Sequence, residues 1–188
     1  MSKLTYLTGN KDKFESASFH FKIYGVELIQ EKIDLQEIQA EDSLNIVKDK
    51  LDKAFNLIKK PLIVTDISWY FNALNGFPGP YMKYVNNWLK CTDLLAMYKD
   101  KKDKTFERHH YIGYKDTQKT KIFKIVEKGE VLDKKYGEDV AINEMDKVIT
   151  FDLVNKTPYS LATNTKRNAH YLKNKNKYEE IINYIKLL

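Results

Sequence analysis

The segment from Pro61 to Tyr81, PLIVTDISWYFNALNGFPGPY, limits the possible folds of this chain more than any other. It opens with the apolar run PLIV and carries one carboxylate, Asp66, two residues later. A short apolar run bounded by turn-forming residues predicts a buried strand. Because ligands of α/β sheets bind outside the carboxyl ends of the strands, Asp66 at the end of this run is a candidate site residue. From this segment alone, an Asp that caps the next element explains the position equally well.

The composition predicts one globular domain over residues 1–188. Hydrophobic residues make up 43% of the chain and aromatic residues 13%, which suits a protein that buries a substantial core. The N-terminus is too short and too polar for a signal peptide, and no apolar run approaches the roughly 20 residues that cross a bilayer. The single cysteine, Cys91, excludes an internal disulfide and predicts a small buried side chain in a protein of the reducing cytoplasm.

The charge balance favours an anionic ligand. The chain has 32 Lys and Arg residues against 26 Asp and Glu residues, a net charge of +6. Such an excess suits a nucleotide or a nucleic acid. The sequence favours a nucleotide over a nucleic acid, since no predicted element carries a stripe of Lys and Arg interleaved with aromatic residues.

The first element pair has the form of an anion site. Residues 4–7 are predicted to form a strand, Thr8-Gly9-Asn10 breaks it, and residues 12–24 have helical spacing. A strand, a glycine turn and a helix present backbone N–H groups and a helix N-terminus to an anion. Lys13 places a positive charge where the helix dipole prefers a negative one, which makes sense if a phosphate binds there. Without other evidence, a surface lysine after an ordinary turn remains the simpler interpretation.

The remaining elements are predicted from periodicity and turn residues. The acidic connector at residues 34–43 has four acids in ten residues; it is either a solvated loop with a helix cap or a source of oxygen ligands for Mg²⁺. Strands are expected at residues 26–33, 106–114, 121–126 and 148–154, helices at 44–58, 82–99, 164–172 and 178–188, and a turn region at 129–137.

Four motifs in one order, TGNKDK, IDLQEIQAE, PLIVTD and FNALNGFPGPY, resemble the inosine/xanthosine triphosphate pyrophosphatase family. The resemblance covers residues 1 to about 90. It implies cleavage of non-canonical purine nucleoside triphosphates to the monophosphate and pyrophosphate. It also implies an α/β fold with an elongated mixed central sheet flanked by helices, two lobes around a nucleotide-binding cleft, a homodimer, and Mg²⁺ or Mn²⁺ as cofactor.

Matching positions carry the family's roles into this chain. Thr8, Gly9, Asn10 and Lys13 fall on the phosphate-binding turn. Glu37 falls on the metal-binding glutamate, and Asp66 on the essential aspartate, a metal ligand that orients or deprotonates the attacking water. The family's helical lysine falls on Lys50, or on Lys48 with a different gap.

The chain departs from the family in both halves. Thr65 replaces the first of two consecutive acids, which predicts weaker metal binding or a shifted metal. The base-recognition run aligns with Met145 and Asp146, or with residues 136–139 if an insertion is allowed. Met145 then replaces an aromatic residue that would stack on the base.

The last motif is also rewritten. Arg167 and the Asn that follows it match the family's Lys-Asn pair, and residues 165–167 offer a second possible register. The Ser-His-Arg sequence, which in the family contacts a 6-oxo base, is missing. Three hypotheses follow. The chain is an active pyrophosphatase with altered or relaxed base specificity, which the phosphate half favours; or it keeps the purine preference through other contacts; or it is a non-catalytic nucleotide-binding or interaction protein.

Overall fold

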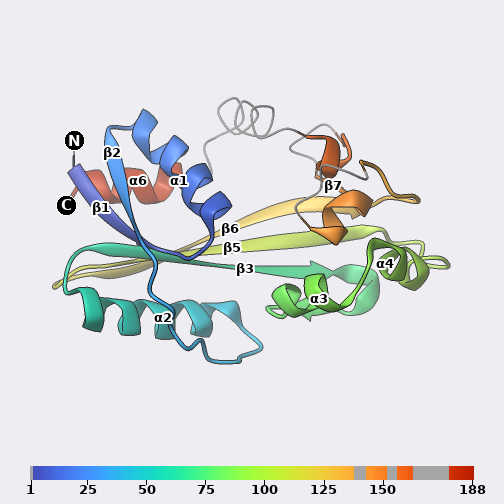
Figure 1. Ribbon diagram of the computed structural model, residues 1–188, viewed down its shortest axis with the longest axis horizontal. Helices are drawn as coiled ribbons and strands as arrows, with labels where there is room; N and C mark the ends of the chain where they lie inside the picture. The colour runs from blue at the N-terminus through green and yellow to red at the C-terminus, as the bar shows by residue number, and fades with distance from the viewer. Residues whose placement is uncertain (1, 138–142, 152–155, 163–177) are drawn as a thin grey trace. The chain divides into compact units, whose positions relative to one another are not determined.

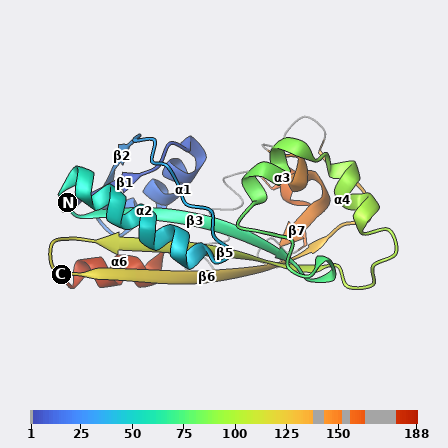
Figure 2. The same ribbon diagram turned by 90° about the horizontal axis from the view of Figure 1, so that it is seen from below.

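The computed structural model describes residues 2–137, 143–151, 156–162 and 178–188 (Figures 1 and 2). In chain order the elements, with η for 3₁₀ helices, are β1 (Ser2–Leu7), α1 (Lys11–Ile23), β2 (Val26–Glu31), α2 (Ser43–Ile58), β3 (Leu62–Phe71), η1 (Asn72–Leu74), β4 (Pro78–Gly79), α3 (Met82–Trp88), α4 (Cys91–Met97), β5 (Thr105–Lys115), β6 (Thr120–Val131), η2 (Glu144–Val148), β7 (Ile149–Phe151), η4 (Tyr159–Leu161) and α6 (Glu179–Lys186).

The strands form one mixed sheet. Their order is β2-β1-β3-β5-β6-β7, and β4 pairs with β3. β1 is parallel to both β2 and β3, whereas the pairs β3/β4 and β6/β7 are antiparallel. A mixed sheet flanked by helices confirms the predicted α/β class. The chain divides into two compact units, one of Met1–Asp66, His110–Ile125 and Lys175–Leu188, the other of Ile67–His109 and Val126–Asn174.

In the first unit, alternate residues of β3 pack on opposite faces of the sheet. Leu62 and Val64 belong to a cluster with Val47, Leu51 and Ala54 of α2. Ile63 belongs to a second cluster, which contains buried residues of α1 and α6. Figure 1 shows α2 on one side of the strands and α1 and α6 on the other. The two-residue period of a strand therefore gives this unit a core on each face.

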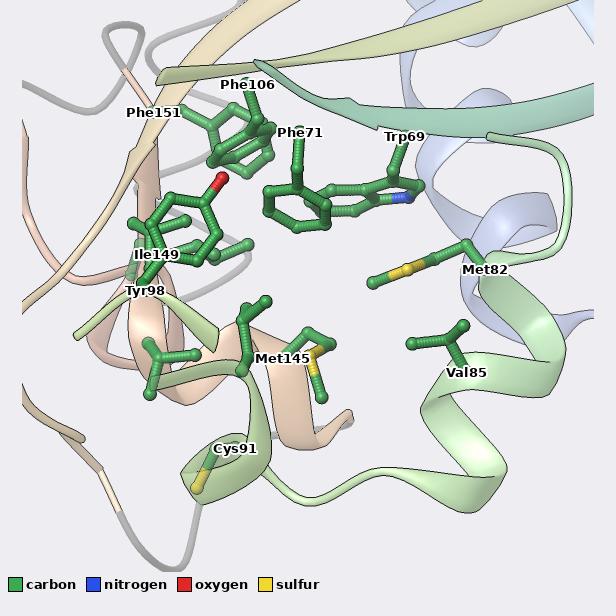
Figure 3. Close-up of a cluster of buried hydrophobic side chains, with 14 residues drawn as sticks. Trp69, Phe71, Met82, Val85, Cys91, Tyr98, Phe106, Met145, Ile149 and Phe151 are labelled. Carbon is green, nitrogen blue, oxygen red and sulfur yellow. The ribbon is translucent and has the colours of Figure 1, made fainter. Parts of the chain in front are cut away.

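The second unit is built around aromatic rings. Figure 3 shows Trp69 and Phe71 of β3 beside Phe106 of β5 and Phe151 of β7. The ring centroids of Trp69 and Phe106 are 5.3 Å apart, and those of Phe71 and Phe106 are 5.1 Å apart. Cys91 at the start of α4 is buried in the same cluster, as predicted. Within the described part of the chain, no helix is long and apolar enough to cross a membrane.

β3 is longer than the sequence analysis predicts, which changes the position of Asp66 relative to the end of its strand. The strand continues to Phe71, five residues past Asp66, because the following residues Ser68, Trp69 and Phe71 are themselves buried. Asp66 therefore lies inside β3 and not at its end. The interpretation of Asp66 as a cap is also wrong, since no helix begins there.

The helix expected over residues 82–99 is two helices. Leu89 and Lys90 are extended between α3 and α4, and the Asp93 carboxylate accepts a hydrogen bond from the Lys90 N–H, which starts α4 afresh. At the junction, Leu89 packs against the core, whereas Trp88 is 74% exposed.

The turn region expected at residues 129–137 begins too early. β6 runs through Gly129 to Val131. A side chain at Gly129 would collide with Phe106 and with the Thr150 carbonyl, so the residue at this point of the strand has to be glycine. The glycine therefore serves a close approach between strands. The other elements agree with expectation to within about two residues where the structure describes them; the helix expected at 164–172 lies outside the described residues.

Candidate active site

The predicted phosphate turn and Asp66 lie at one edge of the first unit. β1 pairs with β2 up to Leu7 opposite Glu31, and with β3 up to Tyr6 opposite Ile63. In this parallel register Thr8 comes level with Thr65, and Asp66 lies one residue beyond. Asp66 is thus at the carboxyl ends of the neighbouring strands β1 and β2, although its own strand continues. The prediction that Asp66 lies at a ligand-binding edge therefore rests on the ends of β1 and β2 and not on the end of β3.

The turn from Thr8 to Lys13 is held from both sides. The Thr8 N–H donates to the Glu31 carbonyl at 3.0 Å, and the Gln30 amide donates to the Thr8 carbonyl at 3.0 Å. The Asn10 N–H donates to the Thr8 hydroxyl at 3.2 Å. These bonds fix a turn whose next residues open into solvent.

Asn10 is the N-cap of α1. Its side chain accepts a hydrogen bond from the Lys13 N–H at 2.9 Å, and the helix that follows has 13 residues. A Cβ at Gly9 would meet nothing within 4 Å, so the space beside the turn is open. Exposed N–H groups at the N-terminus of a helix of this length suit an anion.

Asp66 carries an oxygen without a partner. Its side chain is half-buried, and Oδ2 is inaccessible to solvent and has no hydrogen bond within the described residues. Continuing the alternation of Leu62 and Val64, Asp66 lies on the face of β3 that α2 covers. A buried carboxylate oxygen without a partner is costly and needs an explanation, and a ligand is the simplest one.

Thr65, which stands in the place of the family's first acid, is engaged elsewhere. Its hydroxyl is 2.7 Å from the hydroxyl of Tyr6, and both residues are buried. Burial raises the pKa of Tyr6 to about 12, so the phenol keeps its proton at neutral pH. The family's acid position therefore holds a neutral hydrogen-bonded pair in this protein.

Glu37 and Lys50, predicted for different roles, form an ion pair. The Lys50 Nζ lies 2.5 Å from the Glu37 Oε1. One turn further along α2, Lys53 donates to the Gln36 carbonyl at 2.8 Å. The acidic connector is thereby tied to α2. Lys50, and not the exposed Lys48, is the lysine that reaches it.

These residues suit a metal ion that is held partly by protein carboxylates and partly by the phosphates of a substrate. The described residues contain no group of three or more His, Cys, Asp or Glu side chains that could hold a metal by themselves. Mg²⁺ does not need one, since proteins usually hold it through one or two carboxylates and substrate phosphates. The unpartnered oxygen of Asp66 suits such a ligand.

The predicted base contacts belong to the second unit. Met145 is 1% exposed and packs in the hydrophobic cluster of Figure 3, so its side chain cannot stack on a base in this arrangement. Its role here is packing, because an unbranched apolar side chain at this point of η2 fills the core. Asp146 is also buried, with Asn143 Nδ2 3.4 Å from its Oδ2. Arg167 lies outside the described residues, as do residues 138 and 139 of the alternative alignment.

Sequence reasoning missed Tyr6 and Gln30. Gln30 is bonded to the Thr8 carbonyl in the turn, and Tyr6 to the hydroxyl of Thr65. Each lies in a strand, where a buried or half-buried side chain is expected for packing alone, so the sequence did not single them out. The one indication was a tyrosine, with its polar hydroxyl, at an inward position of a short strand.

The fold is that of two solved proteins that are similar over nearly the whole chain. The Ham1 protein of Staphylococcus aureus superposes with a TM-score of 0.76 at 21% identity, covering 98% of each chain. A HAM1 protein of Coxiella burnetii superposes with a TM-score of 0.78 at 16% identity, covering 100% of both chains. These matches establish the α/β fold of the chain.

The chain belongs to the Ham1 family, whose model matches residues 4–171. It is similar to the dITP/XTP pyrophosphatase of Methanosarcina acetivorans, with 36% identity over 114 residues, 61% of this chain and 62% of the relative. It is also similar to the inosine triphosphate pyrophosphatase of Phaeosphaeria nodorum, with 39% identity over 102 residues, 52% and 53% of the two chains. The matches thus span less than two thirds of these relatives' length. The resemblance inferred from the four motifs is confirmed.

Proposed function

We propose that this protein hydrolyses a nucleoside triphosphate to the monophosphate and pyrophosphate at the edge formed by Thr8–Lys13 and Asp66. The observation that carries this proposal is the unpartnered, buried oxygen of Asp66, two residues past the end of β1, at the same edge as an anion-suited helix N-terminus. The names of the curated relatives support the reaction class.

The chain's own groups divide the work. The backbone N–H of Gly9, the hydroxyl of Thr8 and the charge of Lys13 hold the phosphates, and Asn10 shapes the turn through its bonds to Thr8 and Lys13. Lys50 adds a second positive charge. Asp66 orients the attacking water and accepts its proton while the bridge between the α- and β-phosphates breaks. Positioning and charge stabilisation account for most of the catalysis of phosphoryl transfer, so these few groups suffice.

Glu37 and Asp66 are the residues that would hold Mg²⁺, or Mn²⁺ in its place. A divalent ion bound there supplies positive charge that offsets the charge of the phosphates. Because Glu37 is paired with Lys50, binding requires that this pair loosen or share the carboxylate.

The base specificity is proposed to be altered or relaxed. Met145 is buried and the Ser-His-Arg sequence is missing, so two of the family's contacts to a 6-oxo purine are not reproduced. Arg167 remains the candidate for a base or phosphate contact from the second half of the chain, and Asp146 for a contact from η2.

Assembly as a homodimer in the cytoplasm completes the proposal. The free, buried Cys91 suits a reducing compartment. Sedimentation of the purified protein at several concentrations tests the dimer.

A substrate panel tests the reaction. Purified protein is incubated with Mg²⁺ or Mn²⁺ and ITP, XTP, dUTP and the standard ribo- and deoxynucleotides, and pyrophosphate release is followed. Asp66→Asn is expected to lose activity by about 10²–10⁴-fold without unfolding. Asp52→Asn is the matched control, since Asp52 is an exposed residue of α2 that pairs with Lys115; its activity should be unchanged. Nucleotide binding without turnover by wild type under every condition would instead support the non-catalytic hypothesis.

A further inference from the structure

Tyr6 brings a hydroxyl into a hydrophobic cluster. The residue is 1% exposed and packs with apolar residues of β1, α1 and α6. A hydroxyl buried among apolar groups is costly unless it is hydrogen-bonded. Here it is bonded to Thr65 at 2.7 Å, and the side chain of Thr8 is its second partner.

These bonds belong to a continuous path. The path lies on one face of the paired strands β1 and β3. Tyr6 and Thr8 are two residues apart and so point to the same face, and in the parallel register Thr8 is level with Thr65. From Thr8 the path continues to the Asn10 N–H, and the Asn10 side chain caps α1 at Lys13. The path connects the strand that carries Asp66 with the helix N-terminus proposed to bind phosphate.

The path lies where the backbone pairing stops. In the described residues the pairing of β1 with β3 ends at Tyr6 and Ile63, three residues before Asp66. The bond between Tyr6 and Thr65 lies past this end and adjacent in sequence to Asp66. It therefore links the turn to β3 at the point where the strands no longer do so themselves.

We propose that Tyr6 is a positioning residue: its hydroxyl, through Thr65 and Thr8, fixes the phosphate turn relative to Asp66. A neutral hydroxyl pair thus stands where the family has an acid, and the chain keeps a rigid edge without a second carboxylate. This inference rests on the proposed function for its catalytic consequence, while its structural consequence stands without turnover.

Tyr6→Phe tests the proposal, because it removes one oxygen and keeps the ring in the core. The kcat is expected to fall about tenfold, the effect of one buried hydrogen bond, with little change in KM, since Tyr6 contacts no substrate. Tyr114→Phe is the matched control: Tyr114 is buried in the same cluster and its hydroxyl donates to Asp116 at 2.7 Å. Its kcat should equal that of wild type.

Two further measurements separate the outcomes. Amide hydrogen exchange of residues 9–13 and 65–67 should accelerate in Tyr6→Phe and not in Tyr114→Phe. Thr65→Val removes the first of the two bonds and should give part of the Tyr6→Phe effect. The double variant should be no worse than Tyr6→Phe, because Tyr6→Phe already removes the bond to Thr65. Equal exchange in Tyr6→Phe and wild type would overturn the inference. Absence of turnover in wild type would overturn the proposed function, while the exchange comparison would still decide the role of Tyr6.

Discussion

Lys50 on α2 neutralises Glu37 of the acidic connector, so a proposed phosphate ligand and a proposed metal ligand contact each other directly. The pair is partly exposed, with 14% of the Lys50 side chain and 41% of the Glu37 side chain accessible. Such a pair is weak enough to be broken by substrate and metal. The connector is thus held near α2 before anything binds.

The first prediction concerns Lys50→Met. Removing the competing cation should tighten the apparent affinity for Mg²⁺ by about twofold to fivefold, the scale of an exposed ion pair. The KM for the triphosphate should rise about tenfold or more, because a charged hydrogen bond to phosphate is lost. Magnesium and nucleotide titrations of activity measure both. Lys53→Met, one turn away and bonded to Gln36 and Asp49, should change neither by as much; equal effects from both lysines would contradict the assignment.

The second prediction restores the missing acid. In Thr65→Asp the Tyr6 hydroxyl is already positioned to donate to the new carboxylate. The new carboxylate would lie on the opposite face of β3 from Asp66. Its negative charge should still increase the apparent affinity for Mg²⁺ by raising the local negative potential, and the metal-free protein should lose about 1–3 kcal/mol of stability, because a charge is added in a buried position. Calorimetric magnesium titration and urea unfolding are the measurements. Thr65→Asn, similar in shape and uncharged, should leave the magnesium affinity as it is.

The third prediction concerns Glu144, at the start of η2. A hydrogen bond from Lys147, with a second from the Cys91 N–H, holds the pKa of Glu144 at about 2, below its usual value of 4.5. A pKa lowered by folding means a stabilising contribution that is complete above about pH 4.5 and is lost as the pH falls toward 2. Urea unfolding between pH 7 and 2.5 should show a steeper loss of stability for wild type than for Glu144→Gln. Parallel curves would contradict this contribution.

The fourth prediction concerns the buried pair of Arg108 and Glu127. Arg108 Nη2 is 2.6 Å from Glu127 Oε2, and the guanidinium lies over the ring of Phe151, 4.0 Å from its centroid. Arg108→Met should destabilise the protein by about 3–5 kcal/mol, because a buried carboxylate loses its cation. The double variant with Glu127→Leu should recover most of that loss, since apolar residues of similar size can replace a buried pair. Urea unfolding measures both. A double variant less stable than Arg108→Met would contradict this prediction, because it would show that the unpaired carboxylate of Glu127 is not the source of the loss.

The sequence by itself determined the features that depend on neighbouring residues. The buried strand of the PLIV run, the glycine turn before α1 and the amphipathic α2 are written in short windows, and so are the four motifs that indicate the family. Local windows also predicted the burial of Cys91 and the element order of residues 1 to about 80. Propensity, capping and hydrophobic period act over a few residues, so no tertiary information is needed for them.

Only the tertiary structure decided which of the candidate residues meet. Tyr6 and Thr65 are 59 positions apart, and Glu37 and Lys50 belong to different elements. The sequence placed Asp66 at the end of its strand, whereas the buried residues that follow carry β3 onward, so that β1 and not β3 ends beside it. Met145, aligned with a base contact, is instead in the core. Contacts of this kind depend on strand register and side-chain packing across the chain, and no local window of sequence contains either.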